Sequence, residues 1–168
     1  MNAETLRALQ APLKTRYRDD PTSAKRMLKA IGHLGTADIT CIVQTSKGPL
    51  EAGLHPATGG DGSFACSGDM LLEALIGCAG VTLMAVATAM KIPIRKGTVR
   101  AEGDLDFRGT MGVNKDVDVG FQAIRMFFDL DTDATSDQLQ MLIKLTERYC
   151  VVYQTLKKTP AISTHFSA

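Results

Sequence analysis

The chain has 168 residues, of which 45% are hydrophobic, and its 19 basic and 18 acidic residues leave a net charge of +1. This length and composition suit one globular domain with a hydrophobic core, or one half of a tight dimer. The balanced charge, the aromatic content of 5% and the absence of tryptophan argue against a nucleic-acid surface built on electrostatic attraction or base stacking.

The N-terminal residues predict a helical arm. Residues 3–18 carry apolar side chains at loose helical spacing, interrupted by Pro12, and Pro21 marks a break. We therefore divide the chain into an arm, residues 1–24, and a single domain, residues 25–168. The first residues lack the apolar run of a signal peptide, so we expect a cytoplasmic protein with its cysteines in a reducing compartment.

Alternating side chains then predict a half-buried strand over residues 36–46, with Cys41 on its inward face as a core residue. A turn and a short return strand over 50–54 follow, and then a glycine-rich loop. Residues 69–90 are apolar on nearly every side, which predicts a central helix covered on all sides. The segment approaches the length of a membrane span, but Glu73 and its small residues favour a buried core helix.

The second half of the chain predicts a hairpin and a helix. Residues 98–108 alternate cleanly, and a turn separates them from a second strand over 116–130, so the two form an antiparallel pair with one solvated face. Residues 135–138 match a capping box that begins an amphipathic helix carrying Cys150. Strands, helix, strands and helix in this order predict one α+β unit.

Two cysteines lie on the apolar faces of the two main predicted helices, Cys78 on the first and Cys150 on the second. Glycines on both sides of Cys78 permit the close approach that a disulfide needs, with Cα atoms about 5.5–6 Å apart. Two inert core cysteines are the alternative interpretation, because buried cysteine is a common small apolar residue. Cys66, in a loop before the first helix, has no predicted partner, and we treat it as a bystander.

The helix positions predict different thiols. Cys150 lies late in its helix, where the negative end of the dipole disfavours a thiolate. Cys78 lies too far into its helix for the positive end to act, so a low pKa at Cys78 requires a nearby cation, an arginine. Asp69, at the start of the same helix, acts on Cys78 only through a segment that wraps over the helix start.

We expect no metal ion and no cofactor. The histidines, His33, His55 and His165, have no metal-ligand spacing with one another or with the cysteines. The glycine-rich loop lacks the lysine and the strand–helix context of a phosphate-binding loop.

The glycine-rich loop and the start of the long helix resemble the OsmC/Ohr family. The resemblance covers about residues 25–165 and rests on Gly59-Gly60-Asp61, on Ser67-Gly68-Asp69-Met70-Leu71-Leu72-Glu73-Ala74-Leu75-Ile76-Gly77-Cys78, and on the late Cys150. The sequence departs from the family pattern at Ser67, where proline is usual, at Gly68, where some members have glutamate, and at Val151, where a proline usually follows the second cysteine. Without that proline, the helix is free to continue through Cys150.

The resemblance implies an intertwined α+β homodimer, in which antiparallel sheets pack around two main helices and the active sites lie at the interface. It also implies reduction of small organic or inorganic hydroperoxides, with Cys78, Cys150 and Asp69 as catalytic residues. Cys78 becomes a sulfenic acid, Cys150 condenses with it to a disulfide, and an external dithiol or lipoyl-type reductant resets the pair. The activating arginine comes from the early region that contains Arg16, Arg18 and Arg26.

Two other functions stay open at this point. One is a stress-associated binding protein, whose apolar pocket holds a small hydrophobic or sulfur-containing ligand without peroxidase turnover. The other is a structural dimer. In each case the expected partner is a second copy of the chain, with neither nucleic acid nor membrane.

Overall fold

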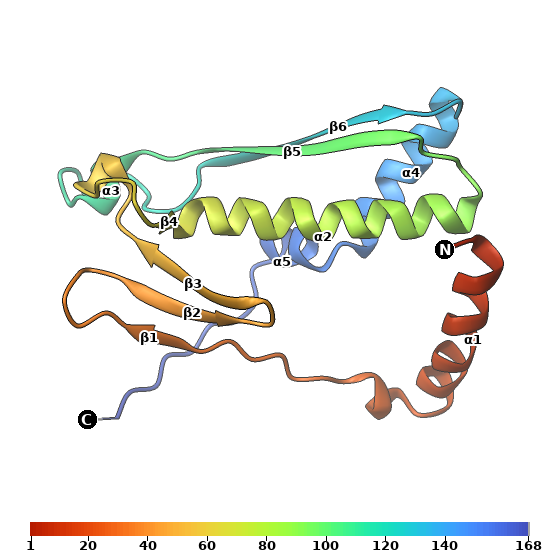
Figure 1. Cartoon of the computed structure of the whole chain (residues 1–168), viewed down its shortest axis with the longest axis horizontal. Helices are drawn as coiled ribbons and strands as arrows, with labels where there is room; N and C mark the ends of the chain where they lie inside the picture. The colour runs from red at the N-terminus through yellow and green to blue at the C-terminus, as the bar shows by residue number, and fades with distance from the viewer. Residues whose placement is uncertain (168) are drawn as a thin grey trace. The chain divides into compact units, whose positions relative to one another are not determined.

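The computed structural model describes residues 1–167. Its elements, in chain order (Figure 1), are helix α1 (Ala3–Asp19), the 3-10 turn η1 (Pro21–Ala24), strands β1 (Gly32–Leu34), β2 (Cys41–Thr45) and β3 (Gly48–Gly53), the 3-10 turn η2 (Pro56–Thr58), strand β4 (Ala65–Cys66), helix α2 (Ser67–Met90), strand β5 (Lys96–Asp104), helix α3 (Phe107–Thr110), strand β6 (Ala123–Asp131), and helices α4 (Ser136–Tyr149) and α5 (Val151–Lys157). The predicted α+β class is confirmed.

The chain divides into two compact units. The first unit consists of residues 1–7, 74–100 and the segment from 127 to the C-terminus, and it holds most of α2 together with α4 and α5. The second unit consists of residues 8–73 and 101–126, and it holds the four-stranded sheet. The division into an arm and one domain drawn from the sequence stays a prediction.

The sheet of the second unit has the strand order β1-β2-β3-β4. Neighbouring strands are antiparallel except β3 and β4, which are parallel. The hairpin β2–β3 pairs Thr45 with Gly48, as the turn predicts, and Gly48 adopts a φ of 126° that favours glycine. The strand predicted over residues 36–46 corresponds to β2 and is shorter than predicted. Residues 36–40 instead form a bend, which is closed by a 2.8 Å hydrogen bond from Gly35 N to Thr40 O.

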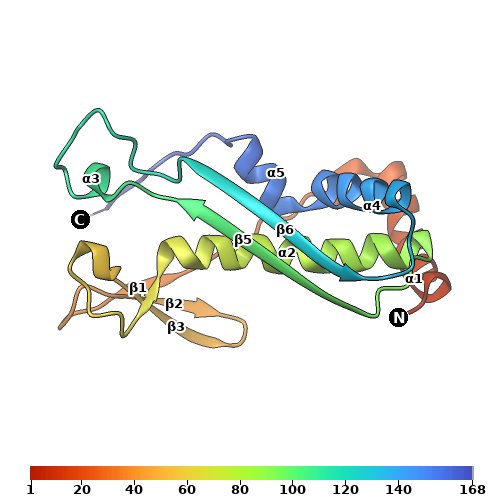
Figure 2. The same ribbon diagram turned by 90° about the horizontal axis from the view of Figure 1, so that it is seen from above.

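The predicted antiparallel hairpin is formed by β5 and β6, which lie side by side in Figure 2. Hydrogen bonds bracket the pair, from Arg95 N to Asp131 O and from Gln122 N to Asp104 O, both 2.9 Å long. The second strand was predicted from residue 116, but it begins at Ala123. Residues 116–122 are a loop that packs its backbone on Gly109, where a Cβ would lie 2.7 Å from Val117 O.

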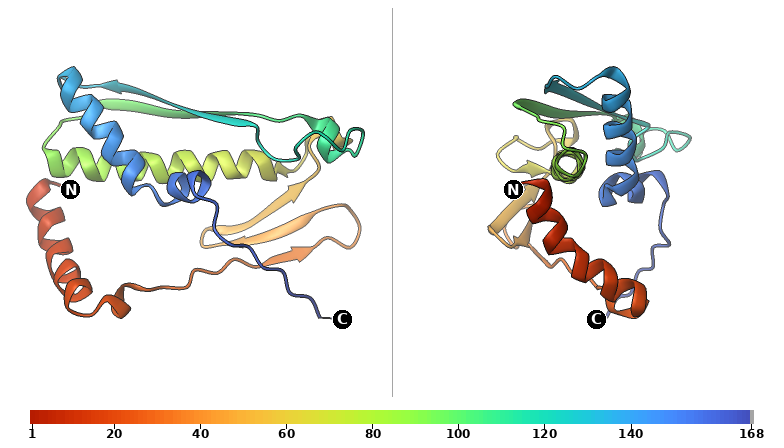
Figure 3. Two further views of the ribbon diagram at one scale, coloured as in Figure 1. Left: turned by 180° about the vertical axis from the view of Figure 1, so that it is seen from behind. Right: turned by 90° about the vertical axis from the view of Figure 1, so that its right-hand side faces the viewer.

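A stripe along α2 forms the core of the first unit. The buried residues of α2 are spaced four apart on one face: Leu75, Ala79, Leu83 and Ala87. Leu83 and Ala87 pack with Leu142 of α4 and with Ile92, which follows α2. Figure 3 shows α4 and α5, in blue, alongside α2, in green. The predicted capping box starts α4, with Gln138 N donating to Thr135 Oγ1 over 3.3 Å.

The rest of α2 is open. Val81 is 74% exposed and Met84 is 49% exposed, so the prediction of a helix covered on all sides is wrong for the single chain. The helix is long and apolar enough to cross a membrane, a test that the core helices of soluble proteins also pass. Helix α2 thus has one face packed in the first unit and apolar residues exposed on another face.

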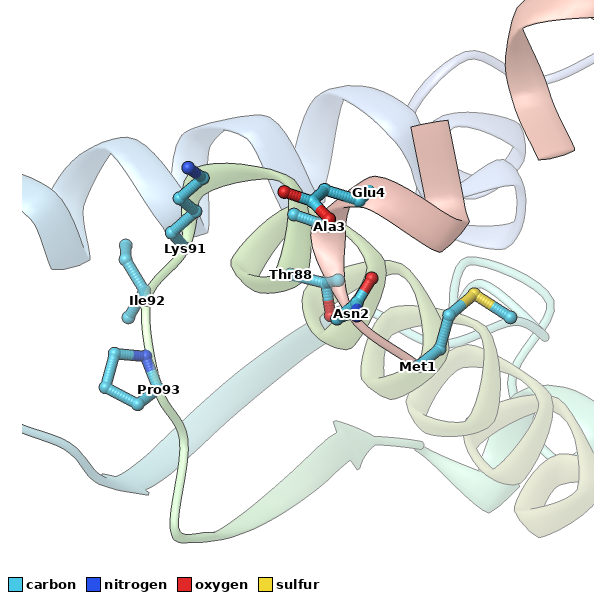
Figure 4. A pocket seen from close by; sticks show the side chains of 8 residues that line it. All are labelled: Met1, Asn2, Ala3, Glu4, Thr88, Lys91, Ile92 and Pro93. Carbon is cyan, nitrogen blue, oxygen red and sulfur yellow. The ribbon is translucent and has the colours of Figure 1, made fainter. Parts of the chain in front are cut away.

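Helix α2 ends in a left-handed turn at Lys91, whose φ is 58°. Lys91 N donates to Thr88 O over 3.1 Å and Ile92 N donates to Ala87 O over 2.9 Å, which is the hydrogen-bond pattern of a Schellman motif. Ile92 is buried and completes the motif with an apolar contact. Figure 4 shows Lys91 and Ile92 on this turn, in the wall of an open pocket of about 440 Å³ that the first residues of the chain also line.

Replacement of Lys91 by glycine should stabilise the protein, because glycine adopts a positive φ without the steric cost that a Cβ brings. The expected gain in the free energy of unfolding is about 0.5–1 kcal/mol, after the entropy that glycine adds to the unfolded chain. Urea unfolding measures this change. Lys91→Ala is the matched control, since it removes the side chain but keeps the Cβ; an equal gain in this variant would contradict the backbone explanation.

Candidate functional site

The structure brings Cys78 and Cys150 together within the first unit. Cys78 lies in the middle of α2, next to the buried Ala79, and Cys150 ends the buried stripe of α4 that contains Leu142 and Thr146. Both cysteines are free thiols, and their sulfur atoms are within hydrogen-bonding reach of each other. Packing of α4 on α2 thus places two thiols from distant parts of the chain in one site.

Helix α4 does not continue through Cys150, although no proline follows this cysteine. Cys150 has an extended backbone, with φ −72° and ψ 111°, and α5 begins at the next residue. Cys150 N closes α4 by donating to Thr146 O over 2.9 Å, and Cys150 Sγ caps α5 by accepting a 3.5 Å hydrogen bond from Tyr153 N. The break is therefore made without a proline, by a side chain that caps the second helix.

The break changes the electrostatics at Cys78. Burial raises the pKa of the Cys78 thiol, but hydrogen bonds from Val152 N, from the Cys150 thiol and from Val151 N outweigh it and leave this pKa below its ordinary value. The side chain of Thr82, one turn further along α2, adds a smaller effect of the same sign. The first N–H groups of a helix have no partner within it and are free to stabilise an anion. The prediction that a low pKa requires an arginine is thereby corrected.

Cys150 has the opposite shift. Burial is the main cause that raises the pKa of Cys150, which is 0% exposed, and the neighbouring Cys78 raises it further, while Tyr153 N opposes. The predicted order of the two thiols therefore agrees with the structure, although its cause is burial and not only the end of α4. Of the two, Cys78 is therefore the thiol that ionises more readily, and Cys150 is the one that holds its proton more tightly.

The other predicted site residues lie in the second unit. Asp69 is exposed in the first turn of α2. Arg16 and Arg18 are exposed in the last turn of α1, and Arg26 follows η1, where Nη1 donates to Lys25 O over 2.7 Å. None of these four residues belongs to the unit that holds Cys78 and Cys150. Their catalytic roles stay predictions.

Cys66 lines a pocket of about 370 Å³ in the second unit. This pocket was not predicted from the sequence. His55 forms part of the wall, with its ring stacked on Phe107 at 4.9 Å between centroids and its Nδ1 accepting from Ala57 N over 3.0 Å. Phe121 forms another part, and its ring lies on Gly103, where a Cβ would come within 2.5 Å. In the sequence, a glycine at position 103, inside a strand of alternating residues, was the signal that another group approaches the backbone closely at this point.

In residues 1–167, no three His, Cys, Asp or Glu side chains are grouped so as to hold a metal ion. The first unit does hold two adjacent thiols, of which Cys78 has the lowered pKa and Cys150 the raised one. Such a pair can donate two electrons and close a disulfide, provided that the sulfur atoms can reach bonding distance.

Comparison with known proteins gives one family and one fold. The family model for OsmC-like protein matches residues 60–165, which include both cysteines. No curated protein matches the chain.

Three solved structures illustrate the shared fold. An OsmC-like protein from Mycoplasma pneumoniae is 16% identical, with a TM-score of 0.67 over 80% of this chain and 90% of that one. The organic hydroperoxide resistance protein OsmC from Legionella pneumophila is 14% identical, with a TM-score of 0.61 over 80% and 92%. The organic hydroperoxide resistance protein OhrB of Bacillus subtilis is 16% identical, with a TM-score of 0.55 over 80% and 93%.

At these identities the structures show a common fold and no more, whereas the family model matches more than half of the chain. The expected resemblance is thus confirmed, and the protein belongs to the OsmC-like family.

Proposed function

We propose that the protein is a thiol-dependent hydroperoxide reductase. The observation that carries the proposal is the pair formed by Cys78, whose pKa is lowered, and the protonated Cys150 beside it. Membership of a family that includes organic hydroperoxide resistance proteins supports a peroxide-related role. A nucleophilic thiolate next to a resolving thiol is the arrangement that two-cysteine peroxide reduction requires.

In the proposed first step, the Cys78 thiolate attacks one peroxide oxygen. A sulfur–oxygen bond forms, the oxygen–oxygen bond breaks, and the alkoxide takes a proton from water and leaves as an alcohol. Cys78 is then a sulfenic acid. The N–H groups of Val151 and Val152 stabilise the thiolate and thereby raise its concentration before the attack.

In the second step, Cys150 loses its proton and its sulfur attacks Cys78. The sulfur–sulfur bond forms and the sulfenic oxygen leaves as water. The whole reaction converts one hydroperoxide and two thiols to an alcohol, water and a disulfide. An external dithiol or lipoyl-type reductant returns both cysteines to the thiol state for the next turnover.

We also propose that the protein acts as a homodimer. The exposed apolar face of α2, with Val81 and Met84, suits burial against a second copy better than exposure to water. Val81→Arg should therefore shift the mass measured by light scattering from dimer towards monomer. Lys47→Arg, in the β2–β3 turn, keeps its charge and serves as the control. A wild-type protein that is monomeric at micromolar concentration would contradict the proposal.

Alkylation should distinguish the two thiols. Because its pKa is lowered, Cys78 should react with iodoacetamide faster than Cys150 at pH 7, and the midpoint of its rate against pH should lie below that of Cys150. The direction follows from the thiolate being the reactive form: the rate falls as pH falls through the pKa. Mass spectrometry of each cysteine peptide across pH measures this. A midpoint for Cys78 at or above that of Cys150 would refute the assigned nucleophile.

Single substitutions should separate the roles. Cys78→Ser should abolish consumption of cumene hydroperoxide, since a serine hydroxyl cannot supply the thiolate that attacks the peroxide and Cys150 has a raised pKa. Cys150→Ser should still reduce one equivalent of peroxide but lose dithiol-dependent turnover, because the sulfenic acid has no resolving partner. Cys66→Ser is the matched control and should keep full activity. Full activity in the Cys78→Ser variant would refute the proposed mechanism.

A second candidate function rests on the apolar pocket beside Cys66. Its volume of about 370 Å³ lies at the lower end of the range for small-molecule sites. A purified protein that consumes no peroxide, but releases a bound hydrophobic molecule on denaturation, would favour this ligand-binding function over the reductase.

A further inference from the structure

A groove of about 420 Å³ lies at the break between α4 and α5 in the first unit. Cys150 is among the residues that line it, while Cys78 is not. Tyr149 and Val151, both exposed, flank the position of Cys150. The groove therefore approaches the cysteine pair from the Cys150 side.

Both charged side chains that line the groove are cations, Arg148 before the break and Lys158 after it. Both residues are exposed, and the Arg148 guanidinium lies 5.6 Å from the centre of the Tyr149 ring. Two cations with no acid among the groove's lining residues attract anions and disfavour cationic molecules. The groove thus attracts anionic molecules and brings them next to Cys150, one residue of the pair.

The chemistry of the pair favours attack from the same side. An external thiolate attacks one sulfur of a disulfide and expels the other as a thiolate, and the thiol of lower pKa leaves faster. Burial raises the pKa of Cys150, whereas the backbone N–H groups of α5 help lower that of Cys78. Attack at Cys150 with Cys78 as leaving group is therefore favoured over the reverse.

Access to Cys150 requires α5 to move. In the dithiol form Cys150 is 0% exposed, and its sulfur caps α5. Bonding to Cys78 takes the sulfur from that capping position, and α5 has only seven residues, too few to be stable without its tertiary contacts. Opening of its first turn is a local event of low cost that exposes the sulfur to the groove.

We infer that this groove is the binding site of the thiol reductant, that Arg148 and Lys158 select a reductant carrying an anionic group, and that the reductant attacks Cys150. The inference rests on the proposed function, in which the Cys78–Cys150 disulfide must be reduced after each turnover. The reductant sulfur bonds to Cys150 Sγ, the Cys78–Cys150 bond breaks, and Cys78 leaves with the electron pair. A second reductant thiol then attacks the reductant's own sulfur in the mixed disulfide and releases the Cys150 thiolate, which takes up a proton.

The test begins with the full-length protein oxidised by diamide, which forms the disulfide without any peroxide. Two monothiols of the same stem are compared, the anionic 2-mercaptoethanesulfonate and the neutral 2-mercaptoethanol, each at equal thiolate concentration. Arg148→Ala and Lys158→Ala should each slow reduction by the sulfonate about two- to fivefold, the range for one exposed charge contact. The rate with 2-mercaptoethanol, whose thiolate lacks the second negative charge of the sulfonate, should fall by less. Lys157→Ala, which removes an adjacent cation outside the groove, should change neither rate.

Acid quenching at early times, followed by peptide mapping, locates the first mixed disulfide. It is expected on Cys150, and a mixed disulfide on Cys78 would overturn the inference. Equal slowing with both monothiols would also overturn the selection of charge. Arg148→Gln and Lys158→Gln, which remove the charge but keep a polar side chain, repeat the comparison if an alanine variant folds poorly. If the oxidised protein shows these effects but the reduced protein consumes no peroxide, the proposed function is refuted and the inference about the groove is not.

Discussion

The extended backbone at Cys150 is the constraint on which the site depends. One residue closes α4 with its N–H group, caps α5 with its sulfur and stands beside Cys78. Because α5 starts there, its first N–H groups are available to the Cys78 sulfur and need no helical partner. A continuous helix would use the same N–H groups internally, and Cys78 would lose two of the hydrogen bonds that oppose the effect of burial, which raises a thiol pKa.

Packing of two apolar stripes holds this arrangement in place. Leu83 and Ala87 of α2 meet Leu142 of α4, and Thr146 and Cys150 continue the buried stripe of α4 from Leu142. The Thr146 hydroxyl donates to Leu142 O over 2.8 Å, so the one buried polar side chain of this stripe is satisfied. The core thus positions the two thiols with apolar side chains, and backbone N–H groups contribute to the lowered pKa of Cys78.

The same break explains how one site can serve two steps. In the dithiol state the sulfur of Cys150 orders α5, and α5 stabilises the Cys78 thiolate. In the proposed disulfide state the cap is lost, the short helix loosens, and the cationic groove beside it meets the buried sulfur. Nucleophile activation and access for the reductant would then depend on the same seven residues.

The sequence by itself determined the class of the fold, the capping box of α4 and the two cysteines, because periodicity and local hydrogen bonding are written in neighbouring residues. The start of β6 was misjudged, since the contact of Gly109 with the loop after residue 116 is not local. Tertiary structure alone decided the break at Cys150 and the source of the low Cys78 pKa. The break is closed by local hydrogen bonds at Cys150, but no proline or glycine marks it in the sequence. The lowered pKa of Cys78 depends on N–H groups of α5, which lie far from Cys78 in the chain and come beside it only when α4 packs on α2.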